Sequence, residues 1–220
     1  MAKGKGLFGS LLGGKNRGFG LNPGAGAAAD LAMPREYQRL RSDAGDPPGS
    51  VCYAAQSESA AAFVMVQDIP AAEAMPFDST APVIAGIHGS LGPDQGLIEV
   101  ECGMCASGVR WMQSIVKSAI QPHGVQYCLT LHLEREGGAV QVQGFFDEMG
   151  TTGMRDTIVF SQMRSTGRIA SDMQGWMRDP YDPDRTKGLR MNLSELREYD
   201  AAFPGHPLSM ARALVGFLTR

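Results

Sequence analysis

The 220-residue sequence has no uninterrupted apolar run long enough to cross a bilayer as a helix. It also lacks the glycine-rich phosphate loops of the common nucleotide-binding folds. These absences exclude a transmembrane helix and leave no cofactor to predict. Hydrophobic residues make up 43% of the chain and charged residues 20%. Because this is ordinary globular usage, we expect most of the chain to fold.

Acidic residues are absent from residues 1–29, which carry four cations, Lys3, Lys5, Lys15 and Arg17. The rest of the chain has a net charge of −7, so the folded body is not expected to bind nucleic acid. A solvated tail is the simplest interpretation of the basic segment. An alternative is weak membrane or partner contact through the apolar side chains Leu7, Phe8, Leu11 and Leu12.

The N-terminal segment resembles a signal peptide only in part. Lys15 and Arg17 follow its short apolar core, where a signal peptide is apolar or small. We therefore predict a cytoplasmic protein. Nine glycines in residues 1–29 and several later prolines predict a disordered, flexible tail and linker over residues 1–48. Residues 34–41 could form one or two helical turns within it. Residues 49–220 are then a single domain.

Hydrophobic periodicity within residues 49–220 predicts both strands and helices. Alternation is clearest over residues 125–134, where Val125, Tyr127 and Leu129 alternate with polar side chains. Similar runs predict strands at 51–55, 62–66, 96–101, 109–117 and 139–146, and apolar spacing of three and four predicts helices at 83–91, 154–163 and 207–218. Strands in one block with helices outside it predict an α+β fold, a single antiparallel sheet of about six strands.

This order of elements resembles the PsbP-like fold over residues 49–220, in layout only. The resemblance implies a binding role, as accessory or chaperone proteins of that fold have. The stretch from Phe203 to Ser209 also resembles the C-terminal part of uncharacterised bacterial proteins.

The four cysteines are Cys52, Cys102, Cys105 and Cys128, and we expect them to be reduced. Cys102 and Cys105 have the spacing of half a zinc ribbon or a redox pair. Cys128 and His132 would have to complete a metal site, since no second cysteine pair exists. We therefore predict no metal and interpret the pair as a turn with small thiols.

A polar cluster at residues 147–156 joins the last strand of the sheet to a helix. Thr151, Thr152 and Arg155 could bind an anion at that helix start, although helix capping and a salt bridge explain the same residues. Trp176, Tyr181 and Phe203 lie in a long irregular region and could contact a partner or pack on the core edge.

These features favour a non-enzymatic protein that binds another protein as an adaptor, chaperone or accessory subunit. The candidate binding residues are Thr151, Thr152, Arg155, Trp176, Tyr181 and Phe203. Two alternatives stay open. One is an enzyme of unknown reaction with its site near Thr151–Asp156, and the other is a peripheral membrane protein anchored by the N-terminal tail.

Overall fold

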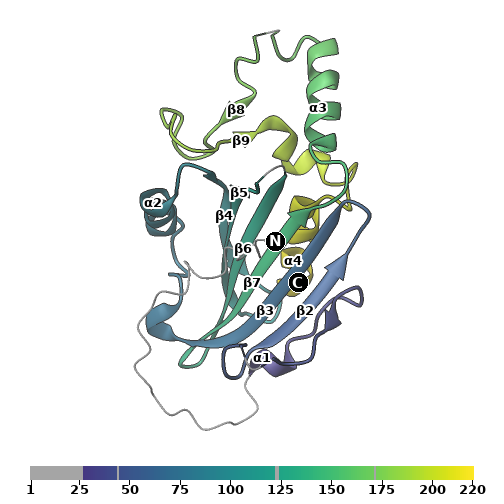
Figure 1. Cartoon of the computed structure of the whole chain (residues 1–220). Coiled ribbons are helices and arrows are strands. Elements are labelled where there is room, and N and C mark those ends of the chain that lie inside the picture. The colour runs from purple at the N-terminus through teal and green to yellow at the C-terminus, as the bar shows by residue number, and fades with distance from the viewer. Residues whose placement is uncertain (1–26, 44, 122–123, 171) are drawn as a thin grey trace, which may run out of the picture.

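The computed structural model describes residues 27–43, 45–121, 124–170 and 172–220. Its centre is one antiparallel sheet with the strand order β1-β2-β3-β7-β6-β5-β4 (Figure 1). The strands are β1 (Gln38–Arg39), β2 (Val51–Gln56), β3 (Ala60–Pro70), β4 (Gln95–Met104), β5 (Arg110–Ala119), β6 (Val125–Arg135) and β7 (Gly138–Glu148). The α+β class is confirmed, and the sheet has seven strands rather than about six.

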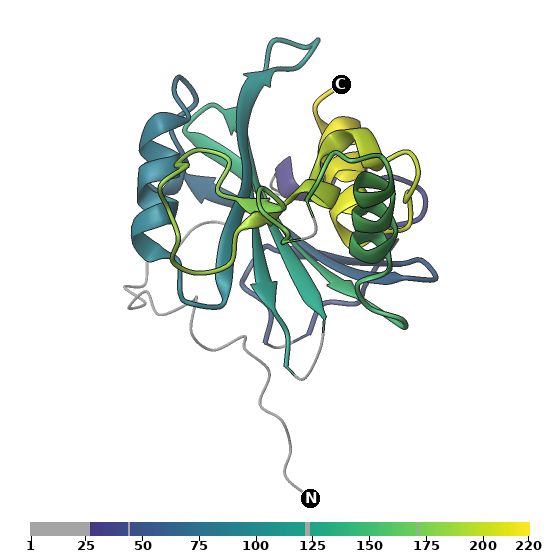
Figure 2. The same ribbon diagram turned by 90° about the horizontal axis from the view of Figure 1, so that it is seen from above.

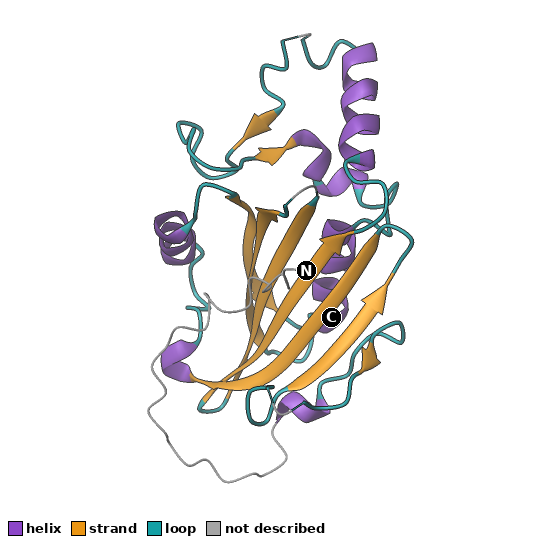
Figure 3. Cartoon of the chain, in the orientation of Figure 1, coloured by secondary structure: helices purple, strands orange, loops and turns teal. Residues whose placement is uncertain are grey.

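Helices lie on opposite sides of this sheet. Helix α4 (Pro207–Leu218) contacts β3, β6 and β7, whereas α2 (Ala81–Ser90) contacts β4 on the other face (Figures 1 and 2). Helix α3 (Met154–Ser165) extends beyond one end of the sheet (Figure 3). Beside α3 lie the short pair β8 (Met177–Arg178) and β9 (Met191–Asn192) and the 3-10 turns η3 (Leu193–Glu195) and η4 (Arg197–Tyr199). Another 3-10 turn, η2 (Ala71–Glu73), follows β3.

The main core lies between the sheet and α4. In β3 every second residue from Ala60 to Val66 is buried, and the same alternation holds over residues 127–131 of β6 and 140–146 of β7. Val64, Leu129 and Phe146 are fully buried on this face, where Leu208 of α4 is fully buried as well. Burying one such side chain stabilises the fold by about 1.5–3 kcal/mol. The alternation of apolar and other residues along these strands therefore gives the sheet one apolar face, and α4 packs on that face.

Gly144 in β7 is required by this packing. A Cβ atom at Gly144 would lie 2.5 Å from the Phe146 ring, closer than two non-bonded carbon atoms can approach. The absence of a side chain at this position lets the Phe146 ring lie across the strand within the core.

The segment before residue 49 differs from its prediction. Ala28 in α1 (Ala27–Asp30) is completely buried, and Tyr37 is 8% exposed. Strand β1 pairs with β2, with Gln38 opposite Ala54. A turn and this strand replace the helical turns expected over residues 34–41, because pairing with β2 overrides local propensity. Residues 27–48 thus contribute to the body, and the predicted disorder of residues 1–26 lies outside the described residues.

Strand β1 is the seventh strand, which the sequence did not predict. It has only two residues, too few for hydrophobic alternation to be recognised in the sequence. No helix within the described ranges has both the length and the hydropathy needed to span a membrane.

Candidate protein-binding surface

Arg155 is a buried structural residue, only 1% exposed. Its Nε donates to the Ser194 carbonyl at 2.7 Å, and its Nη1 donates to the Ser209 hydroxyl at 2.8 Å. Its Nη2 donates to the Leu196 carbonyl at 3.1 Å and to Asp200 at 3.0 Å. Since a guanidinium has five N–H donors in a fixed plane, these bonds leave little of it for an outside anion. The salt bridge weighed in the sequence is the role that this geometry favours.

A second buried charge, Glu195, lies at the end of η3 and is 1% exposed. Lys117 donates to both carboxylate oxygens, at 2.9 and 3.1 Å. The Tyr127 hydroxyl donates to Oε1 at 2.7 Å, and the Asn192 backbone N–H donates to Oε2 at 2.6 Å. Burial, followed by the nearby Glu195 charge, raises the pKa of Tyr127 well above its ordinary value. Tyr127 therefore stays a hydrogen-bond donor.

A third group of buried charges connects α4 to β4. Arg212 donates from Nε to Glu99 at 2.9 Å and from Nη1 to Asp200 at 3.1 Å. Gln113 donates to the other oxygen of Glu99 at 2.9 Å, and Arg197 contacts the same oxygen at 2.8 Å. The buried Glu99 carboxylate needs these hydrogen bonds and ion pairs, because an unpaired buried charge is strongly destabilising.

Together these three groups attach residues 149–206, which we call the lobe, to the sheet and to α4. They bear directly on the enzyme alternative near Thr151–Asp156. Asp156 accepts hydrogen bonds from Asn192 and from the Ser194 hydroxyl, at 2.9 and 2.5 Å. Arg155 and Asp156 thus both bind other residues of the lobe, and the described residues provide no convergent free groups there.

Thr151 and Thr152 are exposed at the start of the lobe. Glu148 accepts the Gly153 backbone N–H at 2.7 Å, so this carboxylate already caps the chain before α3. Burial raises the pKa of Glu148. The two threonines are exposed and accessible to a partner, whereas Arg155, in the first turn of α3, is buried and is not accessible.

Trp176 and Phe203 pack within the lobe. Trp176 is 5% exposed, and its ring meets Phe160 edge-on at a centroid distance of 5.1 Å. Phe203 is half-buried and lies beneath the Arg155 guanidinium, 5.9 Å from it. Of the three aromatic candidates only Tyr181, 38% exposed, presents much surface.

The described cysteines and histidines do not gather into a metal site. Cys102 is exposed and Cys105 is buried. His132 accepts the Met75 backbone N–H through Nδ1 at 2.8 Å, and its Nε2 lies 3.0 Å from the Gln141 side-chain nitrogen. Burial lowers the pKa of His132 to about 4. Within the described ranges no group of three or more His, Cys, Asp or Glu could hold a metal ion.

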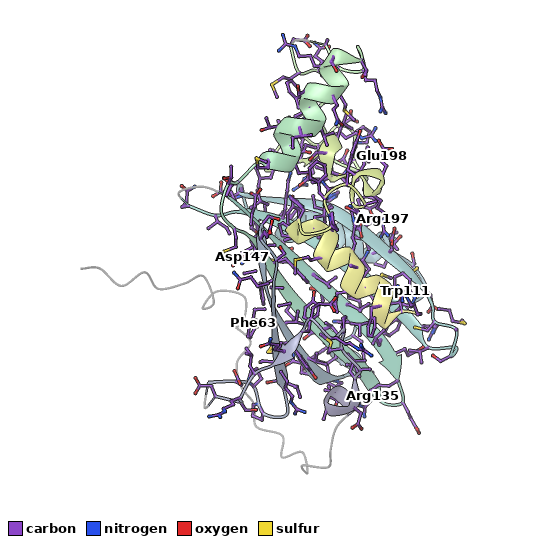
Figure 4. All side chains as sticks on the ribbon, turned by 90° about the vertical axis from the view of Figure 1, so that its right-hand side faces the viewer. Phe63, Trp111, Arg135, Asp147, Arg197 and Glu198 are labelled. Carbon is purple, nitrogen blue, oxygen red and sulfur yellow. The ribbon has the colours of Figure 1, made fainter. Side chains whose placement is uncertain are left out.

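The most distinctive surface is on the sheet itself, on the side opposite α4. We call it the open face and define it by partly exposed side chains of β2, β3, β6 and β7: Ala54, Phe63, Met65, Cys128, Thr130, Gln143 and Phe145. These residues alternate with the core residues, so the same periodicity that buries one set places this set, partly exposed, on the other side of the sheet. Figure 4 shows Phe63 on the side of the sheet away from α4.

Strand register arranges the open face in rows. Phe63 lies opposite both Ala54 and Phe145, and Phe145 lies opposite Cys128. This gives one apolar row across four strands, with two phenylalanines at its centre. In the neighbouring row, Met65 faces Gln143, which faces Thr130. Side chains directly opposite one another in a sheet lie about 5 Å apart, so the apolar row is continuous.

Polar side chains border the apolar row at both ends of the sheet. Towards η2, Gln67 donates to Gln141 at 2.6 Å. Towards the lobe, Gln126 donates to Asp147 at 2.6 Å, and Figure 4 shows Asp147 on the same side of the sheet as Phe63. The open face therefore has an apolar centre with a polar margin, the usual anatomy of a protein interface.

Helix α2 forms the third margin of the open face. A groove of about 370 Å³ lies between α2 and the sheet, with apolar walls that include Val83 and Ile87. Ser114 and Thr130 line its floor. Thr130 belongs to the open face, so the groove and the face form one surface.

Comparisons with known proteins give fold likenesses. No protein-family model matches the sequence, and no curated protein matches it. A protein of unknown function from Pseudomonas aeruginosa is 12% identical and covers 60% of this chain and 95% of its own, with a TM-score of 0.35. Cyanobacterial PsbP from Synechocystis sp. PCC 6803 is 15% identical and covers 62% and 81%, with a TM-score of 0.36. A PsbP protein is thus among the structures this chain resembles, a likeness that concerns the fold alone.

The sequence contained a signal for the open face that its interpretation missed. Phe63, Met65 and Phe145 occupy the positions of β3 and β7 that alternate with buried residues. Such positions face solvent in a sheet with one covered side and are normally polar. Large apolar residues at such positions were the signal in the sequence that this side of the sheet differs from an ordinary solvent-facing one.

Proposed function

We propose that this chain is a non-enzymatic accessory or adaptor protein whose open face binds an amphipathic helix of a partner protein. The observation that carries the proposal is the pair of partly exposed apolar side chains Phe63 and Met65 on β3, which lie on a side of the strand that no described helix covers. The opposite face of the same strands carries α4. The sheet thus already accommodates one helix across β3, β7 and β6, on its other side.

The side chains of the open face specify the chemistry of this partner helix. The apolar row requires leucine or aromatic residues along one helix face, at spacings of three and four. The Gln143 side-chain oxygen already accepts from the Thr130 hydroxyl at 3.1 Å, so its amide nitrogen is the donor beside the row, and Asp147 adds a negative charge at the margin. A basic residue flanking the apolar stripe of the partner would complement that charge.

The remaining candidate residues fit this proposal unequally. Thr151 and Thr152 lie near the Asp147 margin in sequence and are exposed, so they can extend the contact. The four cysteines are free thiols, which suits a reducing compartment, and we place the protein in the cytoplasm.

The test is a quantitative affinity capture with the full chain and two variants, followed by mass spectrometry. Phe63→Gln removes the centre of the apolar row, and Met154→Gln is the matched control on α3, where Met154 is 52% exposed. We expect a stoichiometric partner that the wild type and M154Q retain and F63Q loses at least about tenfold. A partner retained equally by all three chains would contradict the assignment to the open face.

A further inference from the structure

Strand β4 forms one edge of the sheet, and the chain protects only part of it. The Leu189 backbone N–H donates to the Gln95 carbonyl at 3.0 Å. The Tyr181 hydroxyl accepts the Val100 N–H at 2.6 Å and lies 3.2 Å from the Val100 carbonyl, to which it donates. Exposed strand edges invite pairing with another strand, and proteins normally cover them.

The same geometry defines which groups stay uncovered. Both backbone groups of Val100 point away from β5, because Tyr181 reaches them from outside the sheet. In an antiparallel pair this orientation recurs at every second residue. Cys102 and Met104 therefore also point their N–H and C=O groups outwards, and among the described residues no hydrogen bond to these groups is seen from that side.

Exposed apolar surface coincides with this free edge. Met104 is 65% exposed, more than any other large apolar side chain among the described residues. Cys102 is exposed as well. The hairpin formed by the ends of β4 and β5 projects from the body (Figure 2), so another chain can approach the edge.

We propose that a second copy of this chain covers this edge through antiparallel pairing of β4 with β4. Beyond Val100, which Tyr181 covers, Cys102 and Met104 are the strand residues with outward groups, and one register uses the outward groups of both residues in both copies. Cys102 of one copy pairs with Met104 of the second copy, and the reverse. The two Gly103 residues then lie opposite each other at the twofold axis, which gives a closed, symmetric dimer.

The side chains near Gly103 favour a second copy as the occupant. A Cβ atom at Gly103 would lie 2.7 Å from the Trp111 indole, so this ring lies directly over the glycine. Pairing brings the two indoles together on the α4 side of the sheet, where Figure 4 shows Trp111. Cys102 and Met104 share the opposite side, so pairing sets each methionine beside a cysteine of the second copy.

Charge does not oppose this pairing. Glu101 is the one carboxylate within residues 101–105. It is paired with Arg197 of its own chain at 2.5 Å. In the stated register the two Glu101 side chains are not opposite one another, so the interface sets no like charges face to face.

The test is sedimentation equilibrium of the full chain, under reducing conditions, from about 1 µM to about 1 mM. Cys102→Pro removes an outward N–H and places a ring in the interface, which an edge strand tolerates. Met104→Lys puts a charge on the edge and serves equally if C102P does not fold. The matched control is Met154→Lys on α3.

The proposal expects a reversible dimer for the wild type and M154K, with the dissociation constant at least about tenfold higher for M104K and C102P. It also expects amide exchange at Cys102 and Met104 to slow as concentration rises. A wild-type chain that stays monomeric over the whole range would overturn the proposal. So would a dimer that M104K leaves unchanged.

Discussion

Lys117 of β5 and Glu195 of η3 form an ion pair of 2.9 Å in which the two side chains are only 7% and 1% exposed. Tyr127 and the Asn192 backbone satisfy the same carboxylate. The pair joins the lobe to strand β5 of the sheet, and its two residues are 78 positions apart in the sequence. It holds the lobe in a fixed position at the end of the sheet, next to Asp147 on the margin of the open face.

Removing one partner of this pair leaves the other charge buried. Glu195→Leu is expected to lower the free energy of unfolding by about 3–5 kcal/mol, because Lys117 is then unpaired. Urea unfolding followed by circular dichroism measures the loss.

The double variant Lys117→Met/Glu195→Leu is the control for this prediction. Replacing both charges by apolar groups is expected to recover part of the stability, because Lys117 is then no longer left unpaired, whereas the Tyr127 hydroxyl and the Asn192 N–H still lack their acceptor. A double variant as unstable as Glu195→Leu alone would show that the lost hydrogen bonds and packing of Glu195, rather than the unpaired charge of Lys117, account for the loss.

The lowered pKa of the buried His206 side chain should make the stability of the protein depend on pH. Burial, together with the neighbouring positive charges of Arg155 and Arg212, lowers its pKa from 6.5 to about 3. Below pH 6.5 the His206 side chain is protonated in the unfolded chain. In the folded chain it stays neutral until the pH reaches about 3. This contribution to stability is therefore complete above pH 6.5 and is lost as the pH falls towards 3.

His206→Asn isolates this contribution. His206 caps α4 by accepting the Leu208 N–H at 3.3 Å, and asparagine also caps helices without titrating. The difference in unfolding free energy between variant and wild type should change by about 1.4 kcal/mol per pH unit between pH 6 and 4. Denaturant titrations at a series of pH values measure it, and parallel curves for the two chains would refute the assignment.

Tyr181 protects β4 through its hydroxyl group. Tyr181→Phe removes the bonds to both backbone groups of Val100 and should cost about 1 kcal/mol of stability. Amide hydrogen exchange, followed by NMR, should be faster at Val100. The amide of Leu189, which bonds to Gln95 instead, provides an internal reference that should not change. Unchanged protection at Val100 would contradict this role of Tyr181.

Local periodicity was sufficient to predict most of the fold. The alternation over residues 125–134 corresponds to β6, and the apolar spacing over residues 207–218 corresponds to α4 with the same bounds. Pro207 begins that helix as expected from its fixed backbone angle. These elements were predictable because each carries its own hydrophobic pattern.

Features that depend on distant partners were not predictable. The groups that bind Arg155 lie 39 to 54 positions away in the sequence, so nothing near it indicated complete burial. Ala28 is buried because α1 contacts β3 and β7, not because of its local sequence, which is rich in glycine and alanine. The open face could not be recognised until the register placed Phe63 beside Phe145.

Site-specific photo-crosslinking in cells tests most directly whether the open face binds a helix of a partner. A photoreactive phenylalanine analogue replaces Phe63 on the open face or, as the control, Phe217, which is 38% exposed on α4. The account predicts a discrete crosslinked partner at position 63 but not at 217, with the crosslinked peptide mapping to an amphipathic helix of that partner. A crosslinking pattern that is the same at both positions would contradict a helix-binding role for the open face.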